Sequence, residues 1–262
     1  MPTTPAHSGR AMLSGSMRAP PAANAPQLEH IRYWRAEASS GDPYARCRYA
    51  REAQHCAALI MNTADWMRER FVAKMVTRGD FGEIPDCRGV TPQDILPQFD
   101  QLLQSASGGH TPSQLLFAAG GGFALAEGVR FPERLHQFRD HAATLAWRAF
   151  DRGDPDAVVL LWRAYQGVDR DVLFLAGAID PNPVTARALD LLMHELNSDH
   201  VVADAADSGL DKAGLRQAQD LLRDWREHAF AHPRTPRYGL RIETMFDWEK
   251  RAVDLCADVT AP

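Results

Sequence analysis

The stretch from residue 149 to residue 167 constrains the fold of this chain more than any other part of the sequence. It reads Ala-x3-Gly-x3-Ala-x3-Leu-x3-Tyr-x-Gly. Small residues at this spacing allow two helix backbones to approach closely across a tight turn, while the larger apolar residues face a core. Two short helices cannot bury their apolar faces alone, so neighbouring helices must stack on them. The pattern therefore predicts a helical fold.

A Gly-Asp-Pro tripeptide marks expected helix boundaries at residues 41–43 and 153–155. Gly ends one helix because it tolerates a left-handed conformation. Asp caps the next helix by accepting backbone N–H bonds, and Pro fills the first helical position, where no N–H partner is required. Thr-Pro at 111–112 and Asn-Pro at 182–183 repeat the cap followed by Pro. Four helices are therefore expected to start in the same way.

The chain is expected to be all-α, as an irregular array of antiparallel helix pairs similar to an α-solenoid. No sustained alternation of β-branched residues indicates a strand. We expect helices over residues 27–40, 43–77, 92–107, 112–128, 132–152, 155–167, 170–179, 183–197, 211–231 and 240–257.

Residues 1–26 are rich in Ala, Pro and Ser and contain no Asp or Glu, which is typical of a disordered leader. Residues 27–262 are then expected to form one helical-repeat domain. A sub-boundary is expected near residues 78–91, where Gly and Pro accumulate.

The spacing at 149–167 resembles a Sel1-like repeat, a relative of the tetratricopeptide repeat. Trp162 stands where that family commonly has Gly, and the closing Gly comes one residue early. Poorer copies surround Gly41, Gly109 and Asn182, at unequal intervals. The resemblance implies a scaffold with a concave face for a partner protein, and no catalytic residue carries over because the motif positions are structural. The matching positions are Ala149, Gly153, Ala157, Leu161, Tyr165 and Gly167.

Charge and hydropathy argue against two classes of partner. The formal net charge is −5, and the only lysines are Lys74, Lys212 and Lys250. Nucleic-acid-binding surfaces carry clustered Lys and Arg, so no nucleic acid is expected as a partner. No apolar run approaches the ~20 residues that a membrane-spanning helix needs, so no membrane span is expected.

The four cysteines fit no zinc pattern, because no C-x2-C pair occurs. Cys47 and Cys56 are expected on one helix, about 13 Å apart, which is too far for a direct bond. Cys87 lies in a turn-rich loop that could fold back, so a disulfide between Cys56 and Cys87 is the preferred pairing. The alternative is buried free thiols. A disulfide would indicate a periplasmic or secreted protein, whereas free thiols with Met1 as the true start would indicate a cytoplasmic one.

No catalytic, metal-binding or cofactor-binding motif is complete. His194-Glu195 begins like a zinc-protease motif but lacks the second His. His228 and His232 have i, i+4 spacing without a third ligand, so a role at a helix C-terminus is expected for them. The Gly run at 120–122 lacks the Lys and Ser/Thr of a phosphate-binding loop and indicates a helix break or a close helix contact. We expect no catalytic residue, metal or cofactor.

The expected function is a non-enzymatic helical-repeat scaffold that binds another protein, in one version a bacterial accessory or immunity-type protein. Trp162 and Tyr165 are the candidate binding residues if they are exposed on a concave face, because aromatic residues dominate binding energy there. Otherwise they belong to the core.

The alternative is an enzyme or small-molecule binder with a pocket between helices near residues 225–248. A deep pocket with converging His and carboxylate groups would favour the enzyme. A shallow surface flanked by charge would favour the scaffold. The residues that cluster there in the sequence are Trp225, His228, His232, Tyr238 and Trp248.

Overall fold

The computed structural model describes residues 19–61, 87–122, 131–167, 174–197, 208–233 and 255–257. All regular secondary structure in these ranges is helical, which confirms the predicted all-α class. The helices are α1 (Gln27–Ala38), α2 (Pro43–Met61), α4 (Pro92–Ile95), α5 (Gln98–Ser107), α6 (Thr111–Ala118), α8 (Pro132–Phe150), α9 (Pro155–Gln166), α10 (Pro183–Leu196) and α11 (Lys212–His228), with a 3-10 helix η1 (Phe174–Gly177).

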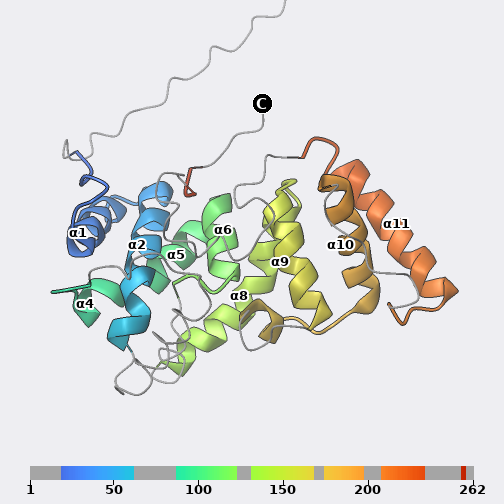
Figure 1. Ribbon diagram of the computed structural model, residues 1–262, viewed down its shortest axis with the longest axis horizontal. Coiled ribbons are helices and arrows are strands. Elements are labelled where there is room, and N and C mark those ends of the chain that lie inside the picture. Colours follow the sequence, from blue (N-terminus) through green and yellow to red (C-terminus); the bar gives the residue numbers. More distant parts are fainter. Residues whose placement is uncertain are drawn as a thin grey trace, which may run out of the picture.

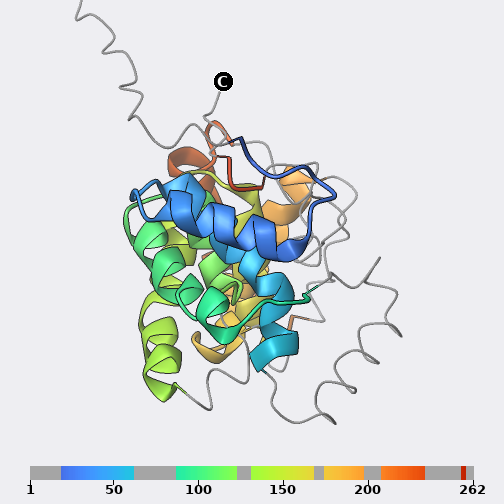
Figure 2. The same cartoon turned by 90° about the vertical axis from the view of Figure 1, so that its left-hand side faces the viewer.

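The helices follow one another along the long axis of the molecule. Helices α1, α2 and α4 occupy one end, and α10 and α11 occupy the other (Figure 1). Most packing is between neighbours in chain order, for example α1 with α2, α9 with α10 and α10 with α11. Figure 2 shows α1 as the outermost helix of its end. Within the described ranges, no helix is long and apolar enough to cross a membrane.

Both Gly-Asp-Pro tripeptides form the expected helix starts. Gly41 and Gly153 have φ of 90° and 72°, in the left-handed region. Asp42 and Asp154 each accept the amide proton of the residue two positions later, at 3.1 Å in both cases. Asn182 caps α10 in the same manner, since its Oδ1 accepts a backbone N–H at 3.0 Å. The fourth start differs, because α6 already begins at residue 111 and its N-cap is residue 110.

Two predicted helices are shorter or divided. The expected helix 92–107 is split into α4 and α5 at Pro97, whose ring removes one N–H donor and clashes with the preceding turn. The expected helix 112–128 ends at Ala118, before the Gly run. The expected break at 120–122 is confirmed, and a Cβ at Gly122 would lie 3.1 Å from the Leu102 side chain of α5, which is the expected close contact with another helix.

Other expected segments fall partly or wholly outside the described residues. The leader is described only from residue 19, and the helix 43–77 only to residue 61. Of the helix 170–179, the structure describes η1. Most of 78–91 and of 240–257 lies outside the described ranges.

Buried apolar side chains form two clusters on opposite faces of α2. Cys47 and Ala50 face the main cluster, which runs through α5, α6, α8, α9 and α10 to Phe230 and Cys256. The other face of α2 contributes to a smaller N-terminal cluster. Because burial of a Leu, Ile or Phe side chain is worth about 1.5–3 kcal/mol, the main cluster holds most of the stabilising apolar contacts. The N-terminal cluster comprises Ile31, Ala38, Ala45, Tyr49, Ala53, Cys56, Ala57, Val90 and Ile95.

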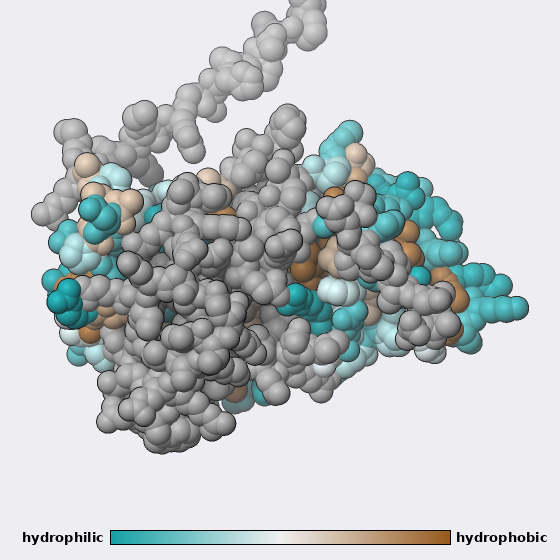
Figure 3. All heavy atoms as spheres, viewed as in Figure 1, coloured by the Kyte–Doolittle hydropathy of each residue, from teal (hydrophilic) through white to brown (hydrophobic). Residues whose placement is uncertain are grey.

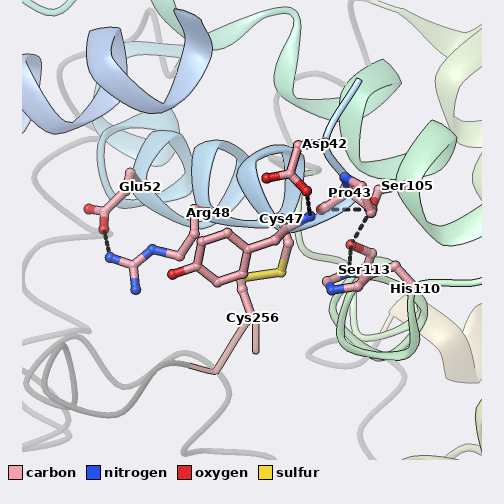
Figure 4. Close-up of a disulfide and its surroundings, with 10 residues drawn as sticks. Asp42, Pro43, Cys47, Arg48, Glu52, Ser105, His110, Ser113 and Cys256 are labelled. Carbon is pink, nitrogen blue, oxygen red and sulfur yellow. Dashed lines mark hydrogen bonds and ion pairs between the residues drawn. A yellow bond between two sulfur atoms is a disulfide. The ribbon is translucent and has the colours of Figure 1, made fainter. Parts of the chain in front are cut away.

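Each cluster contains one disulfide. Cys56 is bonded to Cys87, which is the pair predicted from the sequence. Cys47 is bonded to Cys256, 209 residues away, with 5.7 Å between the Cα atoms (Figure 4). The sequence offered no sign of this second pairing, because spacing alone does not indicate which distant segment meets α2. All four cysteines are paired.

Candidate functional site

A cleft of about 550 Å³ lies between α10 and the C-terminal end of α11. It is the candidate site because it combines an apolar surface with charged side chains from two helices. In Figure 3, hydrophobic residues lie among hydrophilic ones at this end of the molecule. The lining residues are Leu192, Glu195, Leu196, Arg223, Arg226, Glu227, Phe230, Ala231 and Pro233.

The apolar part of the cleft comes from one turn of α10 and from the chain after α11. Leu192 and Leu196 are spaced i, i+4, so they lie on one face of α10. Leu192 and Phe230 are nearly fully buried, whereas Leu196 is half-buried and Ala231 is exposed. Leu196 and Ala231 therefore supply apolar surface at the open side of the cleft, and Leu192 and Phe230 lie beneath it.

The charged part of the cleft is an exposed rim. Arg226 Nε of α11 lies 3.2 Å from Glu195 Oε2 of α10, and their side chains are 59% and 38% exposed. Arg223 pairs with Asp220 of its own helix at 2.7 Å, and both side chains are about two-thirds exposed. Exposed pairs of this kind are worth roughly 0–1 kcal/mol, so a partner could rearrange them at little cost.

An aromatic cluster fixes the position of this wall of the cleft. Phe150 of α8 packs edge-on against Trp225 and Phe230, with ring centroids 5.1 and 4.9 Å apart. The centroid of Trp147 lies 5.9 Å from that of Trp225. The turn between α8 and α9 also packs tightly against the residue that follows α11, since a Cβ at Gly153 would lie 2.6 Å from the Ala229 carbonyl oxygen. The motif at residues 149–167 therefore positions the end of α11.

The two candidate binding residues do not line the cleft. Tyr165 is half-buried, and its hydroxyl accepts the indole N–H of Trp147 at 3.2 Å. Trp162 is also half-buried and packs against the main cluster. Both side chains therefore contribute to helix packing. The residues that do line the cleft carry no motif that the sequence could reveal.

The 225–248 region is only partly described. Trp225 belongs to the aromatic cluster, and His232 is exposed. His228 Nδ1 lies 2.8 Å from the backbone carbonyl of Asp224, which confirms its expected role at the end of α11. That hydrogen bond and the Asp224 carboxylate raise the pKa of His228 above its ordinary value. Tyr238 and Trp248 lie outside the described residues.

A buried Ser–Ser–His network lies at the N-terminal end of α2, beside Pro43 (Figure 4). Ser105 Oγ donates to the Pro43 carbonyl at 2.9 Å, and the hydroxyls of Ser105 and Ser113 are 2.8 Å apart. His110 Nδ1 lies 2.8 Å from the Ser113 hydroxyl. The network joins the start of α2, the end of α5 and the start of α6. Because all three side chains are buried, it presents no nucleophile at the surface.

A second polar network ties α1 to α2. The buried carboxylate of Glu52 accepts a hydrogen bond from Gln27 Nε2 at 2.9 Å and pairs with Arg48 Nη2 at 3.1 Å. The guanidinium of Arg48 also lies over the Trp34 ring, 5.1 Å from its centroid. Each group in this network has a structural partner. Within the described ranges, no group of three His, Cys, Asp or Glu side chains could hold a metal ion.

In comparisons with known proteins, no family model, curated protein or solved structure matches the chain.

Proposed function

We propose that this chain is a non-enzymatic helical scaffold that binds another protein in the cleft between α10 and α11. The cleft carries the proposal, because an apolar surface bordered by exposed ion pairs is typical of a protein-binding groove. Among the lining residues that the structure describes there is no histidine, and the charged side chains remain in contact with solvent. These features support binding over acid–base catalysis.

The occupant that fits is an amphipathic helix with charges of both signs. On α11 the lining residues Arg223, Arg226 and Glu227 are spaced i, i+3 and i+4, so they lie on one face, and Phe230 and Ala231 follow in the chain just after the helix. A partner helix would place apolar side chains on Leu196 and Ala231. Its own charges would meet Glu195 and the arginines at the rim, as in other helix-in-groove complexes.

The proposal also covers the cellular compartment of the protein and its relationship to Sel1-like repeats. Two disulfides support a protein that works in an oxidising compartment, outside the cytoplasm. The neighbour-by-neighbour packing of the helices supports the Sel1-like and tetratricopeptide-like resemblance and a solenoid-like array. A bacterial accessory or immunity-type role is the finer form of the proposal.

The test is a site-specific photo-crosslinker in the full chain, produced in its native cell. A crosslinker at Arg223 faces the cleft, whereas one at Gln217 lies on the exposed opposite side of α11. We expect one stoichiometric adduct from position 223 and none from 217, with the attachment point mapped by mass spectrometry to an amphipathic helix. Equal labelling from both positions, or no adduct, would overturn the proposal.

A matched pair of charge reversals then measures the contribution of the rim. Glu195→Lys reverses an acidic residue in the cleft, and Asp224→Lys makes the same charge change on a residue outside it. We expect Glu195→Lys to weaken binding of the captured partner by about tenfold, because rim charges fix the register of a complex. Asp224→Lys should leave the affinity within about twofold. Equal losses would show that only net charge matters.

A further inference from the structure

The two disulfides differ in exposure. Cys47 and Cys256 are each 1% exposed, within the main cluster. Cys56 is also fully buried, but its partner Cys87 is partly exposed and lies at the edge of the N-terminal cluster. A reductant in solution therefore meets Cys87 before it meets any other bonded sulfur.

Besides the disulfide, the segment that follows Cys87 is held by two buried apolar side chains, by two hydrogen bonds and by the Asp94 carboxylate, which lies 3.7 Å from Arg32 Nε and 3.8 Å from Arg35 Nη1 of α1. Residues 87–95, here called the α4 segment, bury only Val90 and Ile95 in the N-terminal cluster. The Tyr49 hydroxyl donates to the Asp94 carbonyl at 2.8 Å, and Arg35 donates to the Gln93 carbonyl at 2.9 Å. Ordering nine residues costs considerable conformational entropy, which two apolar side chains and a few polar contacts offset poorly.

The main cluster does not depend on that segment. Its connection to α2 runs through Cys47 and Ala50, on the opposite helix face, and through the Cys47–Cys256 bond. Helix α2 packs against α5 as well as against α1. Loss of the α4 segment would therefore uncover part of one side of α2, where α1 still packs, while the other side stays covered by α5.

We propose that the Cys56–Cys87 bond is a redox-sensitive attachment whose reduction releases the α4 segment while the main cluster stays folded. An external dithiol supplies the two electrons. Its thiolate attacks Sγ of Cys87, the bond between Cys87 and Cys56 breaks, and Cys56 leaves as a thiolate that takes up a proton. The second thiol of the reductant then displaces Cys87 as a thiolate, which is also protonated, and the reductant departs as a disulfide.

The proposal is tested first on the unmodified protein. Dithiothreitol is added in a time course, free thiols are alkylated, and each cysteine is quantified by mass spectrometry. We expect alkylation of Cys56 and Cys87 to proceed about tenfold faster than that of Cys47 and Cys256, because reduction requires access to sulfur. Equal rates, or faster reaction of Cys47 and Cys256, would overturn the proposal.

Hydrogen exchange of the half-reduced protein then locates the released segment. We expect amides of residues 90–95 to lose protection, while those of α6 and α9 keep it. The double substitution Cys56→Ser with Cys87→Ser should reproduce this pattern without reductant. Unchanged protection of residues 90–95, or loss of protection across α6 and α9, would overturn the proposal in either preparation. These outcomes do not depend on a partner, so they leave the proposed binding function to its own test.

Discussion

Gly153 lies where the turn between α8 and α9 approaches the end of α11 closely. It has φ of 72°, and any Cβ there would lie 2.6 Å from the Ala229 carbonyl oxygen. A real Cβ cannot occupy that position unless the backbone after α11 shifts. Glycine is therefore required at position 153 for two reasons, the positive φ and the lack of space for a Cβ atom.

Replacing Gly153 by Ala should lower the free energy of unfolding by about 3 kcal/mol or more. The matched control is Gly209→Ala, because Gly209 has φ of 65° and no atom within 4 Å of a Cβ. That variant should lose only about 1–2 kcal/mol, the cost of the left-handed conformation. Denaturant unfolding with intact disulfides measures both values. Similar losses in the two variants would mean that the contact with Ala229 relaxes freely.

Gln98 is fully buried, and neither atom of its amide has a hydrogen-bond partner in the described part of the chain. Gln114 is equally buried and its Oε1 also lacks a partner there, but its Nε2 donates to the Ala106 carbonyl at 3.1 Å. The two glutamines, on adjacent helices, therefore differ in whether the amide nitrogen makes a hydrogen bond.

Substitution by Met keeps the length of the side chain and removes the amide. Gln98→Met should raise the free energy of unfolding by about 1 kcal/mol, because it removes an unpaired buried polar group. Gln114→Met should lower it by about 1 kcal/mol, because it removes a hydrogen bond. Urea denaturation of the two variants decides the matter by the sign of the change. A loss of stability in Gln98→Met equal to that in Gln114→Met would contradict the prediction.

At the scale of single elements, Asp94 attaches α4 to α1. Its Oδ2 accepts hydrogen bonds from Thr91 N at 3.0 Å and Thr91 Oγ1 at 2.7 Å. Its Oδ1 lies 3.7 Å from Arg32 Nε and 3.8 Å from Arg35 Nη1. Burial raises the pKa of Asp94, but the Thr91 hydrogen bonds and the two arginine charges outweigh it and hold the pKa below 3.8.

Asp94→Asn should lower the free energy of unfolding by about 1–3 kcal/mol at neutral pH. Because the pKa is lower in the folded than in the unfolded chain, the carboxylate stabilises the fold fully above pH 3.8. This contribution decreases as the pH falls through the folded-state pKa, so the difference between wild type and variant should shrink in acid. Thermal unfolding between pH 7 and pH 2 measures it. Asp100→Asn is the control, since its side chain is 65% exposed and should contribute less than about 1 kcal/mol.

Helix starts were predictable from the sequence, whereas several helix ends were not. Asp154 and Asn182 cap their helices through local contacts that the sequence specifies directly. The predicted helix 92–107 was wrong to run through Pro97, since Pro cannot donate a backbone hydrogen bond in a helix interior. The early end of α6 is also local, because Gly120 and Gly122 have positive φ and the Gly121 N–H donates to the Leu116 carbonyl of the same helix. The approach of Gly122 to Leu102 of α5 appears only once the helices are placed.

At the scale of the whole molecule, the two walls of the cleft could not be predicted together from the sequence. The sequence drew attention to residues 225–248, and Phe230 of the cleft wall lies in that range. Its opposite wall comes from Leu192 and Glu195, on a helix that no local pattern connects to α11. The aromatic residues predicted as binding candidates, Trp162 and Tyr165, are used for packing because the neighbouring helices cover them. Pairing between helices, rather than helix formation, was the missing information.

Removing the Cys47–Cys256 bond should have a larger global effect than removing Cys56–Cys87. The first closes a loop of 209 residues and the second a loop of 31, and longer loops restrict the unfolded chain more. We expect Cys47→Ser with Cys256→Ser to lower the free energy of unfolding by about 4 kcal/mol. Guanidinium denaturation, followed by tryptophan fluorescence, compares the two double variants. An equal or smaller loss for the longer bridge would contradict this expectation.

The 209-residue span also determines the order in which the bonds become available during synthesis. A chain made from its N-terminus presents Cys47, Cys56 and Cys87 before Cys256 exists. Once α2 has formed, Cys47 and Cys56 are held about 13 Å apart and cannot pair, which leaves Cys87 as the competing partner for both. Once Cys56 has paired with Cys87, Cys47 has no free cysteine to pair with until Cys256 is synthesised. A chain that first forms a bond between Cys47 and Cys87 must exchange it through thiol–disulfide exchange, the reaction that a disulfide isomerase catalyses.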